Sequence, residues 1–219
     1  MNEELNKFLE PLKNSLGENL VSIVLYGSAA RGGNISKFSD TNLMIVVKDL
    51  TLEKLYSWRG IINKAKNTNI NPIFWTQDEV KYSTDIFPIE FLGIKENYEI
   101  LAGEDVIKDI KIDTKNFRHQ LEFELRSKLF IMRNEWINLK GSKAFLSDFL
   151  IRMGASFSYL FKYAGKLAGD KLSPALAEPF NKCVKLKKKE IKIGRSELEN
   201  LYEQVYKSAL EVTDTINDI

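Results

Sequence analysis

The sequence is poor in the residues that build disulfides and zinc centres. Its 219 residues include one cysteine, Cys183, and one histidine, His119. A lone cysteine has no partner for a disulfide within the chain, and a structural zinc site needs about four ligands, mostly cysteine or histidine. The sequence therefore excludes both kinds of site, and we expect a protein of the reducing cytoplasm.

Long hydrophobic runs are also missing. The longest mostly apolar stretches are interrupted by a charged residue or a glycine well before the roughly 18 residues that a membrane span needs. The N-terminal segment, MNEELNKFLEPLKNSL, carries acids and amides where an export signal has a basic start and an apolar core. We therefore expect neither export nor a membrane as a partner.

A strong charge of one sign is the third absence. The 32 lysine and arginine residues nearly balance the 30 aspartate and glutamate residues, which leaves a net charge of +2. So small a charge creates no global field that would attract nucleic acid. The local candidate is the basic run 182–192, but charge runs are usually solvated, and no aromatic residue in this run could stack on bases. Nucleic acid therefore stays a possible partner without support.

The first half of the chain alternates short apolar runs with helical patterns. Residues 21–26 and 43–47 are rich in aliphatic and β-branched side chains, which favours strands, and a third such run covers 72–75. The spacing of apolar residues predicts helices around 5–12 and over 52–65. This order of elements is typical of an α/β layer structure. The run 43–47 is apolar on both faces, so it should lie inside the sheet.

In the second half, apolar residues recur at intervals of three and four, as they do on one face of a helix. Gly141, Gly169 with Pro174, and Gly194 separate these helical stretches. We therefore expect an antiparallel bundle of about four helices, of which the one around 175–189 is less regular. The residues expected in its core are Leu121, Leu125, Leu129, Met132 and Trp136, then Phe145, Phe149, Met153, Phe157 and Phe161, then Leu198, Leu201, Val205, Ala209, Val212 and Ile216.

A glycine turn, GSAARG over residues 27–32, follows the first predicted strand. Glycine at such a turn lets the backbone approach a phosphate closely. The turn lacks the middle glycine of the dinucleotide-binding pattern G-x-G-x-x-G. It also lacks the lysine of the mononucleotide-binding loop, because residues 32–34 read GGN. Both of these nucleotide-binding motifs are therefore excluded.

A third pattern matches. The Gly27-Ser28 pair, then Ala30-Arg31-Gly32, then Ser39-Asp40 before an apolar strand resemble the signature of the nucleotidyltransferase superfamily, which has a polymerase-β-like fold. The resemblance is to its small bacterial members and covers about residues 5–76. It implies an α/β (α+β) domain with a mixed sheet over residues 1–112. An all-α helical bundle domain over residues 113–219 would follow, as in antibiotic nucleotidyltransferases.

The resemblance also implies the residues of a site. In the family, the Gly-Ser pair opens a short helix whose amides hold a nucleoside triphosphate such as ATP, which would make Gly27 and Ser28 nucleotide-binding residues. Arg31 is either a further phosphate ligand or a solvated helix residue. An Asp-x-Asp on the next strand binds magnesium, so Asp40 would be the catalytic residue and a metal ligand, with Asn42 as the second ligand. Side chains at positions i and i+2 point to one face of a strand, where they can share a divalent cation.

Two positions depart from the family's pattern. Asn42 replaces the second acid, and an amide oxygen can coordinate magnesium but brings no charge. The third acid, the base for the attacking hydroxyl, should lie within residues 71–74, which contain none. Asp78 and Glu79 follow at an apparent helix N-terminus, where the helix dipole favours acids in any case. The sequence therefore predicts weak binding of magnesium, if any, and an incomplete set of carboxylates.

These observations leave three functions open. An active protein would transfer a nucleoside monophosphate from a triphosphate to the hydroxyl of an unidentified acceptor. A non-catalytic nucleotide-binding sensor would keep Gly27, Ser28 and Asp40 without the transfer. An antitoxin-like module that binds another protein would use the fold only as a scaffold.

Two further residues could contribute to a site. Glu90 either turns towards the site and replaces the missing acid or forms local interactions. His119 is more often structural in a helix, since no second histidine supports a metal site or a proton relay.

Overall fold

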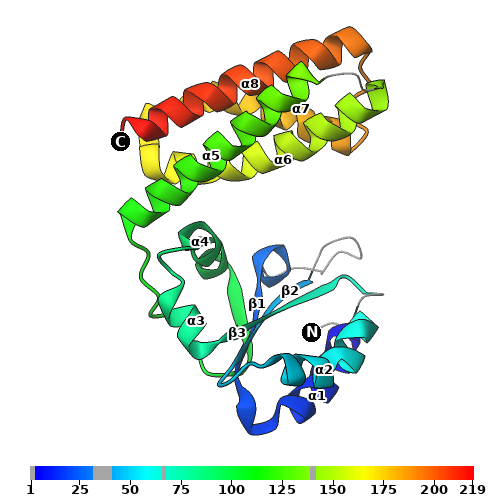
Figure 1. The fold of residues 1–219 in the computed structure, drawn as a ribbon, viewed down its shortest axis with the longest axis vertical. Helices are drawn as coiled ribbons and strands as arrows, with labels where there is room; N and C mark the ends of the chain where they lie inside the picture. Colours follow the sequence, from blue (N-terminus) through cyan, green and yellow to red (C-terminus); the bar gives the residue numbers. More distant parts are fainter. Residues whose placement is uncertain (1–2, 32–40, 66–67, 139–141) are drawn as a thin grey trace. The chain divides into compact units, whose positions relative to one another are not determined.

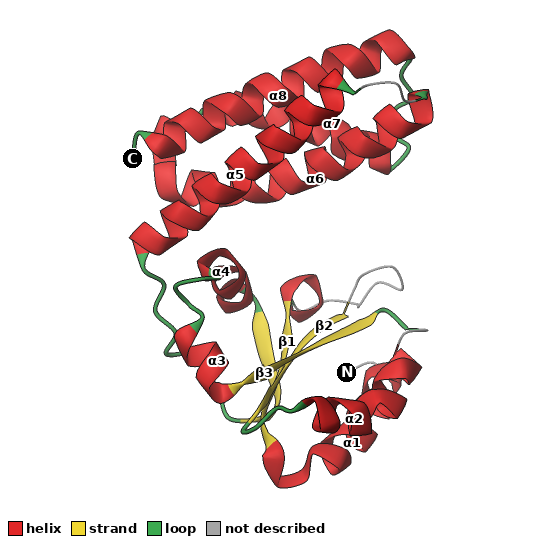
Figure 2. Cartoon of the chain, viewed as in Figure 1, coloured by secondary structure: helices red, strands yellow, loops and turns green. Residues whose placement is uncertain are grey.

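The computed structural model describes residues 3–31, 41–65, 68–138 and 142–219. The chain divides into two compact units, Met1–Asp113 and Thr114–Ile219, which are drawn in Figures 1 and 2. The first unit contains α1 (Glu3–Leu16), β1 (Leu20–Tyr26), β2 (Thr41–Val47), α2 (Leu52–Ala65), β3 (Ile70–Thr76), α3 (Gln77–Tyr82), α4 (Pro88–Glu96) and β4 (Tyr98–Gly103), with the short 3-10 helices η1 (Gly17–Asn19) and η2 (Gly27–Ala30). The second contains α5 (Thr114–Ile137), α6 (Lys143–Ala168), α7 (Glu178–Lys187) and α8 (Arg195–Asn217), with η3 (Gly169–Lys171) and η4 (Pro174–Ala177).

The sheet of the first unit is mixed. Its strands lie in the order β3-β2-β1-β4, in which β1 runs antiparallel to β2 and β4 while β2 and β3 are parallel. The predicted interior position of 43–47 is confirmed, because β2 lies between β1 and β3 and its residues from Leu43 to Val47 are buried. This arrangement confirms the expected α/β domain with a mixed sheet.

Helices cover both faces of the sheet (Figure 1). On one face, α1 and α2 pack on a cluster that includes Ile23, Leu25, Leu43, Ile45 and Val47. On the other face, residues of α3 and α4 pack on a cluster that includes Val24, Met44 and Val46. Alternate residues of each strand therefore belong to different cores, as the two-residue period of a strand requires.

Two elements of the first unit do not follow from the apolar pattern. Helix α4 has the sequence PIEFLGIKE, in which apolar residues surround most of the helix, so it shows no periodicity of 3.6 residues. Strand β4 pairs with β1 at the edge of the described sheet and exposes Glu99 and Gly103. The proline at the first position of α4 is the sequence signal that could have identified this helix.

The second unit is the expected bundle of helices. Core positions of α5, α6 and α8 are buried as predicted, among them Leu125, Phe157 and Val205. The less regular helix is also present, since η4 leads directly into α7. The separator Gly169 lies at the C-terminus of α6 and Gly194 at the N-terminus of α8, whereas Gly141 lies outside the described residues.

Four of the expected core residues are not fully buried: Met153 and Phe161 are half-buried, and Trp136 and Phe145 are exposed. Trp136 is 40% exposed and Phe145 is 41% exposed. Trp136 lies 15 positions after Leu121, and at 100° per residue the two side chains point about 60° apart. The buried Leu129 is about 80° from Leu121 on the same scale, so Trp136 lies on the buried stripe, and its exposure follows from its place next to the last residue of α5. Phe145 lies in the first turn of α6, where the helix is least covered.

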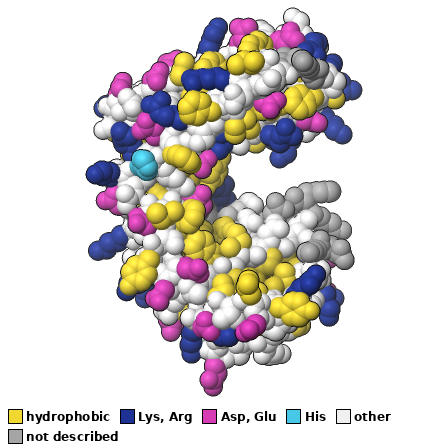
Figure 3. Space-filling model, viewed as in Figure 1, with side chains coloured by type: hydrophobic (Ala, Val, Ile, Leu, Met, Phe, Trp, Pro, Cys, Tyr) yellow, Lys and Arg dark blue, Asp and Glu magenta, His cyan; other side chains and the backbone are white. Residues whose placement is uncertain are grey.

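None of the described helices combines the length and the apolar character that would let it cross a membrane. Figure 3 shows acidic and basic side chains intermingled over the visible surface, without a large area of one sign.

Helices α6 and α7 approach each other closely at Gly154. A Cβ atom at Gly154 of α6 would lie 2.1 Å from Cβ and 2.8 Å from Sγ of Cys183. Burial raises the pKa of the Cys183 thiol to about 12, so this thiol stays protonated and is no nucleophile at neutral pH. The single cysteine is therefore a packing residue.

We predict that Gly154→Ala destabilises the bundle, because the added methyl group forces α7 away from α6, at a cost of about 1–3 kcal/mol. The control is Gly165→Ala on the same helix, where nothing lies within 4 Å of the new Cβ atom. It should stabilise by about 0.5–1 kcal/mol, since alanine is the better helix former. Thermal unfolding followed by circular dichroism measures both, and equal midpoints for the two variants would contradict the prediction.

Candidate functional site

The glycine turn follows directly on β1. Gly27 begins η2 with φ +80°, a left-handed conformation that side chains other than hydrogen disfavour. Its amide donates a hydrogen bond of 3.0 Å to the carbonyl oxygen of Asn97, between α4 and β4. Ser28 and Arg31 follow, and both are exposed. The structure thus ties the turn to the α4–β4 connection and leaves Ser28 and Arg31 accessible.

Asn42 lies beside this turn. In the sheet it is paired with Tyr26, the last residue of β1, and a Cβ atom at Gly27 would lie 3.5 Å from Nδ2 of Asn42. The structure therefore brings Gly27 and Asn42 together. Asp40 lies outside the described residues, so its predicted role stays a prediction.

A row of polar and aromatic residues crosses this end of the sheet. Asn42 is paired with Asn71 on β3, and Tyr26 is paired with Tyr98 on β4. Directly paired residues point to the same face of a sheet, so the row consists of Asn71, Asn42, Tyr26 and Tyr98. It contains no carboxylate.

Strand β3 provides no third acid. Asn71 is the residue opposite Asn42, and Ile73 and Trp75 follow on the same face. Glu79 has a structural role, because Thr76 and Glu79 form a capping box at the start of α3, with Thr76 N donating to Oε2 of Glu79 over 2.7 Å. Asp78 is an exposed residue in the first turn of the same helix. On the face of Asn42, β3 therefore presents Asn71, Ile73 and Trp75.

The described strands beside the turn, β1, β2 and β3, can offer magnesium only neutral ligands. The candidates are the amide oxygens of Asn42 and Asn71, and within the described ranges no group of three or more histidine, cysteine or acidic residues could hold a metal ion. Magnesium is commonly held by one or two carboxylates together with substrate phosphates. One carboxylate from Asp40, with the phosphates of a nucleotide, would complete a fitting set.

The acids of α4 take two different positions relative to the turn. Glu90 is exposed in the first turn of the helix, whereas Glu96 is its half-buried last residue and directly precedes Asn97. They are six positions apart along the helix, which corresponds to a rise of about 9 Å. Sequence reasoning considered Glu90 and missed Glu96, and the hydrogen bond between Gly27 and Asn97 indicates that the C-terminal end of α4 is nearer to the turn.

Tyr98 holds the other end of the row in place. Its hydroxyl donates to Oδ2 of Asp105 over 3.1 Å, while Oδ1 accepts from the backbone amides of Ile107 and Lys108, each at 3.0 Å. Burial acts to raise the pKa of Asp105, but these amides and the Tyr98 hydroxyl hold it below its usual value. Burial and then Asp105 raise the pKa of Tyr98. Asp105 is therefore a positioning residue in its charged form.

The remaining candidates belong to the second unit. His119 is exposed on α5, next to an ion-paired group in which Glu122 binds Arg118 at 2.7 Å and Arg126 at 2.8 Å. The basic run 182–192 covers the C-terminal part of α7 and the residues after it, and most of its lysines are exposed. Cations at a helix C-terminus are favoured by the helix dipole.

The chain is similar to known proteins in sequence and in fold. A relative from Methanocaldococcus jannaschii, which carries the provisional name of a protein adenylyltransferase, is 36% identical over 119 residues, which cover 48% of this chain and 74% of the relative. The fold is similar to that of spectinomycin adenyltransferase AAD(9) from Enterococcus faecialis with ATP and spectinomycin, with a TM-score of 0.57, 12% identity and coverage of 98% of both chains. No model of a protein family matches the chain.

We predict a pH-dependent contribution of Asp105 to stability. Because its pKa is lower in the folded state, the contribution is present above its ordinary pKa of about 3.9 and is lost as the pH falls through the lower folded value. Asp105→Asn should therefore cost about 1 kcal/mol at pH 7 and progressively less below pH 4. Urea unfolding across this pH range measures the difference. Asp109→Asn, at an exposed neighbouring acid, is the control, and a difference that does not shrink in acid would contradict the prediction.

Proposed function

The chain belongs to the nucleotidyltransferase superfamily, and from this premise we propose that its first unit binds a nucleoside triphosphate at the turn Gly27–Ala30. The observation that supports this most is the proximity of Gly27 and Asn42, because it brings the glycine turn and the strand of the family's metal-binding motif together. The first unit is then the nucleotidyltransferase-like domain and the second the helical bundle domain. ATP is the proposed nucleotide, since both similar proteins are named for adenylyl transfer.

Each residue of the proposed site has its own task. At Gly27 the missing side chain lets the backbone approach the phosphates, and the exposed Ser28 and Arg31 contribute a hydroxyl and a guanidinium. Asp40 and Asn42 would hold magnesium together with phosphate oxygens. The bound cation would neutralise charge on the triphosphate.

The proposed reaction is the transfer of a nucleoside monophosphate to a hydroxyl. The acceptor oxygen bonds to the α-phosphorus, the bond from this phosphorus to the pyrophosphate oxygen breaks, and pyrophosphate leaves. The hydroxyl proton needs an acceptor, and no acid of β3 lies on the face of Asn42. We therefore propose a slow transfer, because general-base catalysis commonly contributes about 10²–10⁴-fold to a rate.

A nucleotide-binding sensor without transfer is the second candidate. It is favoured by the pairing of Asn42 with Asn71, which puts two neutral amides where the family's pattern has acids. Release of pyrophosphate from ATP distinguishes the two functions, because only the transferase forms it. The antitoxin-like module remains the third function if no nucleotide binds.

We predict that the purified chain binds ATP in the presence of magnesium. Calorimetric titration with ATP, GTP, CTP and UTP, with and without magnesium, measures this. Asp40→Ala should abolish the effect of magnesium, whereas Asn42→Asp should strengthen magnesium-dependent binding by roughly tenfold, through one added negative charge. Asp78→Asn, at an exposed acid of α3, is the control. If none of the four nucleotides binds, both nucleotide functions are wrong.

A second prediction concerns the turn itself. Gly27→Ala and Gly17→Ala each place a side chain at a positive φ, of +80° and +51°, and each should cost about 1–2 kcal/mol of stability. Only Gly27→Ala should also weaken binding of ATP, because its Cβ atom occupies the space beside Asn42 that a phosphate would approach. Comparing ATP affinity of the two folded variants separates general strain from a local effect. An equal loss of ATP affinity in the two variants would mean that the nucleotide does not bind beside Gly27.

A further inference from the structure

The bundle contains a pocket that the proposed nucleotide function leaves unexplained. It lies between α5 and α8 and has a volume of about 470 Å³. Cavities that bind small molecules commonly measure about 300–1,000 Å³. All the residues that line it belong to the second unit: Met132, Arg133, Trp136, Ile137, Tyr202, Glu203, Tyr206 and Lys207.

The inner wall of the pocket is rigid and aromatic. Tyr202 is 2% exposed, and its hydroxyl donates a hydrogen bond to the carbonyl oxygen of Met132. Its ring stacks on Phe149 at 5.7 Å between centroids and lies 4.7 Å from the ring of Trp136. This wall is thus fixed by the core of the bundle before any ligand arrives.

The outer part of the pocket leaves apolar surface in water. Trp136 is 40% exposed and the next residue, Ile137, is 81% exposed. A flat aromatic ligand would cover the indole and gain both the burial of apolar area and the preferred contact between aromatic rings.

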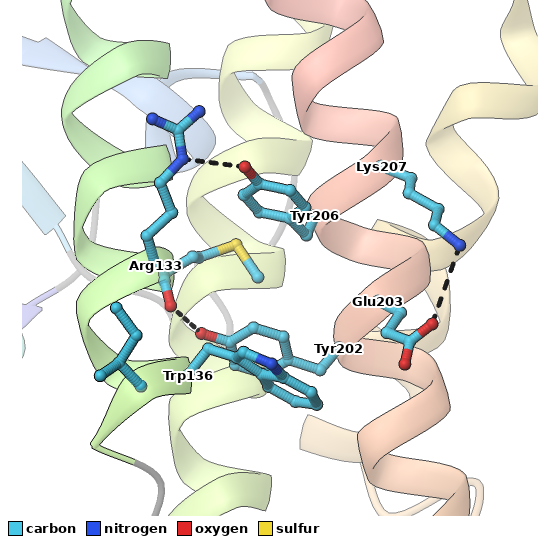
Figure 4. A pocket seen from close by; sticks show the side chains of 8 residues that line it. Arg133, Trp136, Tyr202, Glu203, Tyr206 and Lys207 are labelled. Carbon is cyan, nitrogen blue, oxygen red and sulfur yellow. Dashed lines mark hydrogen bonds and ion pairs between the residues drawn. The ribbon is translucent and has the colours of Figure 1, made fainter.

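A guanidinium group is held at the other end of the pocket. Nε of Arg133 donates to the hydroxyl of Tyr206 over 2.8 Å, and the group lies 5.5 Å from the ring centre of Phe130 and 5.8 Å from that of Tyr206. Figure 4 shows Arg133 and Tyr206 facing each other from α5 and α8, with Trp136 and Tyr202 further along the same groove. Among the described residues, only Tyr206 hydrogen-bonds to Arg133, so its two terminal nitrogens can bind an anion in a bidentate manner.

The other charges of the pocket do not neutralise this arginine. Lys207 and Glu203 form a pair at 3.7 Å, and both side chains are largely exposed. The lining therefore carries one net positive charge, on a side chain that two aromatic rings and a hydrogen bond already orient. A site oriented in advance binds its ligand at a lower entropic cost.

We propose that this pocket binds a small aromatic anion, with its ring against Trp136 and its carboxylate or sulfonate group on Arg133. The aromatic wall selects a flat ring, and the guanidinium selects an anion over a neutral molecule of the same shape. The described residues that line the site belong to α5 and α8, and none of them is part of the proposed nucleotide site of the first unit.

The test uses two fluorescent probes of nearly the same shape on the full-length chain. Anilinonaphthalene sulfonate carries a negative charge, and N-phenylnaphthylamine is its neutral counterpart. The sulfonate should bind at one probe per chain and more tightly than the neutral probe. Arg133→Gln should weaken binding of the sulfonate about tenfold and leave binding of the neutral probe unchanged. Trp136→Ala should weaken binding of both probes.

The matched control is Arg126→Gln, at an exposed arginine of the same helix that pairs with Glu122 and does not line the pocket. It should change neither affinity. Circular dichroism confirms that each variant is folded, since the sulfonate probe also binds loosely packed states. The proposal is wrong if Arg133→Gln and Arg126→Gln bind the sulfonate equally, or if two copies of the chain associate and exclude both probes. ATP titration of the Arg133→Gln variant tests the nucleotide proposal separately. Arg133 does not belong to the proposed nucleotide site, so a failure to bind ATP would not change the result obtained with the two probes.

Discussion

The burial of β2 on both faces is the constraint on which the first unit depends. Its residues from Leu43 to Val47 are at most 1% exposed, between two neighbouring strands and two layers of helices. A shift of one residue in the pairing would exchange every side chain between the two faces, so packing strongly determines the register. The register in turn places Asn42 opposite Tyr26 and Asn71. Apolar residues of the strand thus fix the position of the polar ones.

Sequence alone predicted the parts of the fold with strong periodicity, and the glycine turn with them. Helix α2 and the strands β1, β2 and β3 follow from apolar spacing, because burial on known faces leaves a regular pattern. Helix α4 and strand β4 show no such regular pattern, so the hydrogen bond from Gly27 to Asn97 could not be predicted from the sequence. The pairing of Asn42 with Asn71 also needed the register, which residue spacing does not contain. The predicted role of Asp40 rests on the sequence alone.

Helix α5 contributes both to the core of the bundle and to its surface. The spacing buries Leu125 and Leu129, whereas Trp136 lies on the same stripe next to the last residue of the helix and is 40% exposed, which the apolar pattern does not predict. The aromatic side chain that leaves the core stays in contact with Tyr202 within it. One wall of the pocket therefore continues the packed interior of the bundle. The packing that stabilises the bundle also fixes the shape of this wall.

The position of Asn42 has a consequence for how this lineage can change. Asparagine and aspartate have nearly the same shape, and their codons differ in a single base. A substitution of that base would add a carboxylate two residues after Asp40, on the strand face beside Gly27, while the buried residues of β2 would keep their packing. A site with one acid at positions 40 and 42 and a site with two acids there thus differ by one point mutation, in either direction. The apolar residues of β2 are compatible with both.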